Sequence, residues 1–149
     1  MIDIENTVFN RIATALRTAY LTTYPGLKVY GEFVEYPESF PCVSLWVTDN
    51  YTYTRSQDAD KQEHHANVMV TTEIYTVGDG RKDLAKKLAE TVDTEMQDMY
   101  FTRTAMMVLP NVDRNAFRIT LRHTAVVGQP ASETDGNGNT TLTFLTYRE

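Results

Sequence analysis

Two histidines and a glutamate that are adjacent in sequence are the first candidates for metal chemistry. His64 and His65 directly follow Glu63, and imidazole and carboxylate groups are common metal ligands. Adjacent residues on a strand point to opposite faces, so the two histidines do not readily converge on one ion. The acidic stretch 58–63, DADKQE, lacks the glycine and glutamate spacing of an EF-hand calcium loop. We therefore expect solvated loop residues here and no metal site.

The sequence also contains no recognisable motif for a nucleophilic residue or for a phosphate-binding loop. The only cysteine, Cys42, lies in a strand-like run without the signature of a catalytic thiol, and we interpret it as a half-buried structural residue. His123 has no partner nearby in sequence, and we expect it on the polar side of its strand or at a switch of faces. The glycine-rich stretches GDG and DGNGN match neither a dinucleotide nor a P-loop pattern. The sequence predicts no catalytic residue and no cofactor.

The composition narrows the class of protein. A chain of 149 residues with 42% hydrophobic and 23% charged residues predicts one globular domain over 1–149. Its net charge of −6 argues against free-standing DNA or RNA binding, because phosphate neutralisation supplies most of that affinity. One cysteine allows no intrachain disulfide. The acidic, amphipathic opening and the absence of a long apolar stretch predict neither a signal peptide nor a membrane span, and indicate a reducing cytosol.

Two segments have helical periodicity. In residues 3–20 apolar side chains recur every fourth position, and Asp3 is the expected N-cap. A second stripe begins after the GDGRKD turn and runs from Leu84 to about Tyr100. We expect both stripes to pack against a sheet. Their members are Val8, Ile12 and Leu16 in the first segment and Leu84, Leu88, Val92 and Met96 in the second.

The remaining segments alternate as strands do. We expect strands over 27–33, from 42 through 54, and over 66–77, 103–109, 116–128 and 141–149. A polar tip over 55–65 predicts a long hairpin, and 129–140 has the composition of a flexible loop. Long helices segregated from mostly antiparallel strands indicate an α+β fold with two helices on one face of the sheet.

The surface offers candidates for an interface. We expect Arg103, Arg118 and Arg122 to line one exposed face of the sheet. That face is either solvated, with cross-strand charge pairs, or meets an acidic partner protein. Tyr51 and Tyr53 lie outside obvious core positions, which is typical of a protein that completes interfaces with its neighbours. The candidate interface residues are Tyr51, Tyr53, Arg55, Arg118 and Arg122.

The order of elements and several local motifs resemble a known family. A helix and a strand precede the pattern P-x-x-F-P-C-V-S-L at 37–45, which leads to Asp49-Asn50. A polar hairpin follows, and then EIYTVGDGRKDLAKKLAETVDTEM at 73–96. These features, over residues 1 to about 128, resemble the tail terminator (tail-completion) proteins of long-tailed bacteriophages, which are similar to the minor tail protein U group. The C-terminal DGNGN hairpin has no counterpart in that pattern.

The resemblance implies a structural virion protein without catalytic residues. It implies a subunit that assembles in the host cytoplasm into a ring of itself, with six members, on the finished tail tube. Its further partners would be the tail tube protein and the head–tail connector proteins, with no membrane and no sequence-specific nucleic acid. Two alternatives remain open, a head-side connector or stopper protein and, more remotely, a small α+β enzyme or ligand-binding domain.

Overall fold

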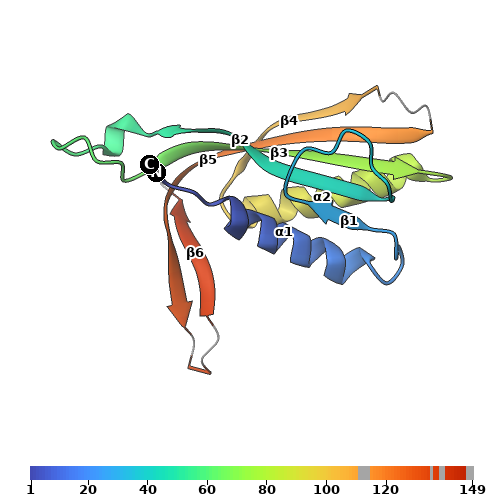
Figure 1. Cartoon of the computed structure of the whole chain (residues 1–149), viewed down its shortest axis with the longest axis horizontal. Helices are drawn as coiled ribbons and strands as arrows, with labels where there is room; N and C mark the ends of the chain where they lie inside the picture. The colour runs from blue at the N-terminus through green and yellow to red at the C-terminus, as the bar shows by residue number, and fades with distance from the viewer. Residues whose placement is uncertain (111–114, 135, 138–139, 147–149) are drawn as a thin grey trace.

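The fold is α+β, as the sequence predicts. We describe a computed structural model over residues 1–110, 115–134, 136–137 and 140–146. Helices α1 (Glu5–Tyr20) and α2 (Arg81–Asp98) lie side by side on one face of a mostly antiparallel sheet (Figure 1). The sheet order is β1-β2-β3-β5-β4, and β6 pairs with β5 off this path. The strands are β1 (Lys28–Tyr30), β2 (Cys42–Thr52), β3 (Ala66–Val77), β4 (Thr102–Leu109), β5 (Ala116–Thr134) and β6 (Thr140–Thr146).

Each helix buries the stripe that its sequence predicts. Both stripes face the sheet in one continuous core, with only Leu84 at its margin. Helix α1 begins later than expected, because Ile4 is its N-cap and makes no side-chain cap, while Asp3 Oδ1 accepts from the N–H of Glu5. The residues that the two helices bury are Val8, Ile12, Ala13 and Leu16 of α1 and Ala85, Leu88, Ala89, Val92 and Met96 of α2.

A tight turn joins β3 to α2. Gly78 and Gly80 have φ values of +84° and +73°, a conformation that costs a residue with a side chain but not glycine. This turn, residues 78–80, reverses the chain, so that α2 packs beneath β3 and β5. Thr76 Oγ1 donates to the carbonyl of Arg81 at 2.7 Å and links the strand to the first turn of the helix.

The segment 31–41 is the first departure from expectation. The strand predicted over 27–33 ends at Tyr30, because β1 pairs in parallel with the first residues of β2 and the chain then crosses to the other face of the sheet. There Phe33 is 52% exposed and packs edge to face on Trp46, with 5.7 Å between the two ring centroids. Ser39 Oγ donates to the carbonyl of Gly26, where an added Cβ would lie 2.6 Å from the Phe40 carbonyl oxygen. The segment therefore covers one end of the face opposite the helices, and we call this the open face.

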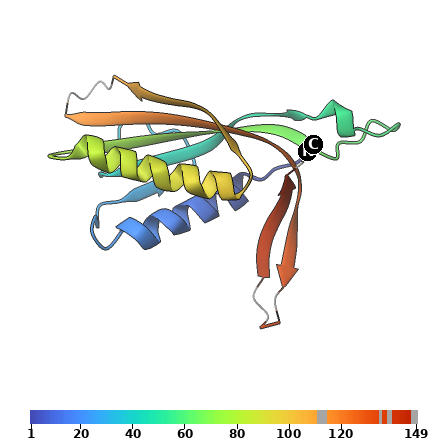
Figure 2. The ribbon, with the colours of Figure 1, turned by 180° about the vertical axis from the view of Figure 1, so that it is seen from behind.

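The C-terminal region is the second departure. Residues 129–134 were expected in a flexible loop but continue β5, which runs to Thr134 and pairs antiparallel with β6. Backbone pairing has prevailed over the low strand propensity of this stretch. The resulting β5–β6 hairpin leaves the body of the molecule and extends past the start of α1 (Figure 1 and, from behind, Figure 2). The predicted strand over 141–149 is described to Thr146, and 147–149 lie outside the described residues.

Candidate assembly surfaces

Three of the predicted interface residues, Tyr51, Tyr53 and Arg55, lie at or just beyond the end of β2, in the β2–β3 hairpin. Tyr51 is 58% exposed on the open face. Tyr53 is half-buried, and its N–H donates to the carbonyl of His65 across the base of the tip. Arg55 lies in a short 3-10 helix, Thr54–Ser56, and is exposed. The three residues therefore form one end of the molecule, away from the arginines of β5.

Hydrogen bonds organise this tip, which we call the β2–β3 arm (50–65). Asp58 Oδ1 accepts from the N–H groups of Asp60 and Gln62, and its Oδ2 lies 3.0 Å from His64 Nε2. The backbone bonds of the turn lower the pKa of Asp58, with a further contribution from His64.

Glu63 anchors the arm to the start of the chain. Its Oε2 accepts from the N–H of Ile2 at 3.0 Å, and its Oε1 accepts from Thr52 Oγ1 at 3.2 Å. Asn50 Nδ2 donates to the carbonyl of Ile2, whose side chain is fully buried. The residues before α1 thus form a brace at the base of the arm.

Arg118 is not the exposed arginine that the sequence predicts. Its side chain is 21% exposed, and its Nη2 donates to Oε1 of Glu73, which is itself nearly buried. The Tyr75 hydroxyl donates to the other carboxylate oxygen of Glu73 at 2.6 Å. The Arg118 guanidinium lies over the Tyr75 ring, 5.5 Å from its centroid, within the range of a cation–π contact. The strand register brings these three side chains together. Tyr75 is opposite Arg118, and Glu73, two residues before Tyr75 on β3, is on the same face of the sheet.

Segment 31–41 explains why these polar groups are buried on the open face. The Val34 carbonyl lies 3.3 Å from the Tyr75 hydroxyl, and Cys42 and Ser44 beside it have no exposed surface. Burial, and then the neighbouring Glu73, raise the pKa of Tyr75 well above its ordinary value. Cys42 is therefore fully rather than half-buried. This burial raises the pKa of its thiol to about 11, so the thiol stays protonated at neutral pH.

The three strand arginines do not share a face. Arg122 is exposed on the open face, opposite Thr71 of β3 and Ala105 of β4. Arg103 is opposite His123, on the helix-facing side, and its Nη1 donates to Asp93 Oδ2 at 3.0 Å. The expectation of one exposed arginine face is therefore wrong for two of its three members. A register shift in β4 lies between Arg103, which is opposite His123, and Ala105, which is opposite Arg122.

His123 lies on the helix-facing side of β5, and not on the polar side or at a switch of faces as expected. It faces α2 with no exposed surface, and its Nε2 lies 2.8 Å from Asp93 Oδ1. Burial lowers the pKa of His123, although the hydrogen bond to Asp93 opposes this effect. Asp93 also accepts from Gln97 Nε2 and Arg103, so its charge is compensated while the histidine remains neutral. No local pattern indicates this cluster, because Asp93 and His123 are 30 residues apart.

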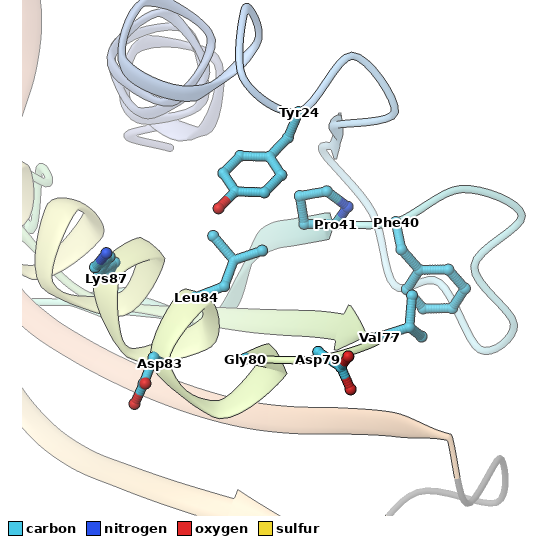
Figure 3. Close-up of a pocket in the computed structure, with 9 residues that line it drawn as sticks. All are labelled: Tyr24, Phe40, Pro41, Val77, Asp79, Gly80, Asp83, Leu84 and Lys87. Carbon is cyan, nitrogen blue, oxygen red and sulfur yellow. The ribbon is translucent and has the colours of Figure 1, made fainter.

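A cleft between the helices and the end of the sheet has the size of a small ligand site but not its chemistry (Figure 3). Its volume is about 330 Å³. Tyr24 and Leu84 face each other across it, whereas the carboxylates of Asp79 and Asp83 point away from it (Figure 3). A ligand site would need polar groups that converge on the cavity. This arrangement gives the enzyme or ligand-binding alternative no support.

A second hollow of about 400 Å³ lies on the open face beside Tyr51. It crosses β2, β3 and β5 and ends against Tyr100 and Thr102, at the start of β4. Aromatic side chains with apolar neighbours are enriched at the centres of protein interfaces. Tyr51 therefore has a setting typical of an interface residue. The other lining residues are Asp49, Asn67, Val68, Met69, Thr124, Ala125 and Val126.

Strand β4 presents exposed apolar residues. Met106 is 45% and Val108 58% exposed, because α2 lies under β3 and β5 and covers little of β4 (Figure 2). The alternation in 102–109 identifies the strand but does not reveal that it is at the edge of the sheet. Met96, by contrast, is a core residue as predicted, and Met99 is buried as well.

The described part of the chain holds no group of three or more His, Cys, Asp or Glu side chains placed to bind a metal ion. None of its described helices is both long enough and apolar enough to span a membrane. The chain matches no known protein-family model and no curated protein.

Proposed function

We propose that this chain is a structural protein of a long-tailed bacteriophage, a tail terminator that assembles as a ring of six on the tail tube. In that role it stops polymerisation of the tube and presents a surface to the head connector. The proposal assigns the chain a structural rather than a catalytic task. It combines the resemblance over residues 1 to about 128 with the surfaces described above.

The β5–β6 hairpin lies outside the region of resemblance, and it is the structural observation that most supports assembly into a ring. Within the described sheet, β6 pairs with no strand but β5, and the hairpin extends away from the helices and the sheet (Figures 1 and 2). An isolated two-stranded hairpin is marginally stable in water, so such an extension gains most when a neighbour covers it. The β2–β3 arm, with Tyr51, Tyr53 and Arg55, is a second extension at the same end.

A ring requires two different surfaces on each subunit. In a head-to-tail ring, one patch of each subunit contacts a different patch of the next, and the rotation closes. The extended β5–β6 hairpin supplies one such surface, because it extends far enough from its own subunit to contact a neighbouring one. The exposed β4 edge and the hollow beside Tyr51 supply patches that can be reached.

Electron microscopy of phage made without this protein tests the proposal. We expect tails of abnormal length, or tails that do not join heads, because nothing would stop the tube or complete its end. Normal tails on infectious particles would contradict a role in the tail. Tails of normal length that remain free beside filled heads would instead assign the protein to the head-side joining class. Complementation with the intact gene is the control.

A further inference from the structure

The outer edge of β4 is open in the described part of the sheet. Strand β4 pairs with β5 on one side only and ends the sheet there. Its eight residues carry one charged side chain, Arg103, which is turned to Asp93 on α2. Proteins usually protect a long edge strand with charges, proline or a covering element. Here Met106 and Val108 remain exposed along that edge instead.

The opposite side of the sheet is protected. Strand β1 has only three residues. Beyond it, the edge of β2 is capped at Val47, whose N–H donates to Glu5 Oε2 at 2.9 Å. Of the two edges of the described sheet, the one formed by β4 is therefore the one that can accept another strand.

The β5–β6 hairpin supplies a strand of matching length. Val127 is opposite both Ala66 of β3 and Thr146 of β6, so β6 occupies the same edge of β5 that β4 uses further along. Strand β6 has seven residues against eight in β4 and contains no proline. The distal half of β5 contains Pro130, which lacks an N–H group, so β6 is the better partner for a new strand.

The two strands of one copy cannot pair with each other. Strand β4 is opposite β5 residues 118–124, and β6 is opposite 127–134, so they follow one another along the same edge. Any pairing between them joins two copies. Charge favours the same contact, because residues 129–146 contain Glu133 and Asp135 and no basic residue, while the exposed Arg122 lies beside β4.

We propose that strand β6 of one copy pairs with the outer edge of β4 in the next copy and continues its sheet. This is β-augmentation, in which backbone hydrogen bonds give affinity and flanking side chains give specificity. The inference rests on the proposed function in one respect, namely that the contact repeats around a head-to-tail ring.

Single-cysteine pairs in the purified full chain test the contact. The native Cys42 is buried with a pKa of about 11, so it contributes little to thiol oxidation and the parent chain is the background. One variant carries Val108→Cys and is mixed at high concentration with variants that carry one cysteine at successive β6 positions, such as Thr141→Cys, Leu142→Cys and Thr143→Cys. Lys86→Cys on the exposed side of α2 is the matched control.

After mild oxidation, we expect dimers between the β4 and β6 variants at several-fold higher yield than with Lys86→Cys. The yield should rise and fall along β6 as the register requires, and Arg122→Glu should lower it. A yield no higher than the control overturns the inference, as does a greater yield of β4–β4 dimers, which would indicate a symmetric dimer. Cross-linking in purified protein does not depend on the phage phenotype, so either proposal can fail while the other stands.

Discussion

Strand β5 carries two charged clusters, five residues apart, on opposite faces of the sheet. On the open face Arg118 pairs with Glu73, and the Tyr75 hydroxyl donates a hydrogen bond to the second oxygen of the Glu73 carboxylate. On the helix face His123 pairs with Asp93, which Arg103 and Gln97 also contact. Both clusters bring together residues distant in sequence. They differ in whether a proton can change their charge near neutral pH.

The difference shows two ways of placing a carboxylate inside a small protein. Glu73 is compensated by an arginine, which remains charged at any ordinary pH, so this cluster keeps its charge state. His123 contributes a group whose ordinary pKa of 6.5 lies near neutrality and which burial keeps unprotonated. We therefore expect mutation of either cluster to change the free energy of unfolding, and only the helix-face cluster to make that free energy depend on pH near neutrality.

The largest expected effect follows from Arg118→Ala. Removal of the arginine leaves Glu73 buried without its cation, and breaking a buried ion pair costs about 3–5 kcal/mol in the free energy of unfolding. Urea unfolding of the variant measures the cost. The control is Arg122→Ala on the same strand and face, which is exposed and should change stability by less than about 0.5 kcal/mol.

A second variant separates loss of the pair from loss of volume. In Glu73→Gln combined with Arg118→Met, neither charge remains, and much of the lost stability should return. If Arg118→Ala costs less than about 1 kcal/mol, water reaches Glu73 and the cluster behaves as an ordinary surface pair.

Tyr75→Phe is a milder way to disturb the same cluster. It removes one donor from Glu73 and leaves the ring under Arg118 in place. A hydrogen bond to a charged group contributes about 1.5–3 kcal/mol, so the loss of unfolding free energy should be smaller than for Arg118→Ala. Thermal and urea unfolding check the order. A larger loss for Tyr75→Phe would mean that the hydroxyl, rather than the guanidinium, stabilises the carboxylate.

The helix-face cluster should produce a pH dependence. Because burial lowers the folded-state pKa of His123, the unfolded chain takes up the proton first as the pH falls. The stability is therefore full above the ordinary pKa of about 6.5 and decreases below it, by at most about 1.4 kcal/mol per pH unit for one proton. Urea unfolding across this range measures the slope.

Two histidine variants test this assignment. His123→Gln should reduce the slope whatever it does to stability at neutral pH, whereas His64→Gln, in the exposed arm, should leave the slope in place. An unchanged slope in His123→Gln would assign the effect to other groups.

Periodicity predicts those parts of the fold that local sequence determines. The stripes around Leu16 and Leu88 face one sheet, and the long alternation from Ala66 to Val77 forms a central strand. A buried face leaves its pattern in the sequence directly, because each apolar residue lies one period from the next. The interface residues were less predictable, and only Tyr51, Arg55 and Arg122 lie exposed as expected.

The rest depends on contacts that no local pattern contains. His123 lies among alternating apolar and polar residues, and its partner on α2 determines that it is buried. Arg118 packs on Tyr75, whose hydroxyl lies near the Val34 carbonyl of segment 31–41, and the path of that segment includes a close approach at Gly26. Residues 129–134 have the composition of a loop and become a strand because β6 pairs with them.

Trp46, the only tryptophan, reports on one small part of this molecule. Its indole lies half-buried against Phe33, at the point where segment 31–41 crosses the open face. Intrinsic fluorescence therefore senses detachment of that segment before it senses the helices or the β5–β6 hairpin. If the segment opens separately, the fluorescence transition will precede the loss of circular dichroism. The gap between the two midpoints would then measure how independently this cover moves.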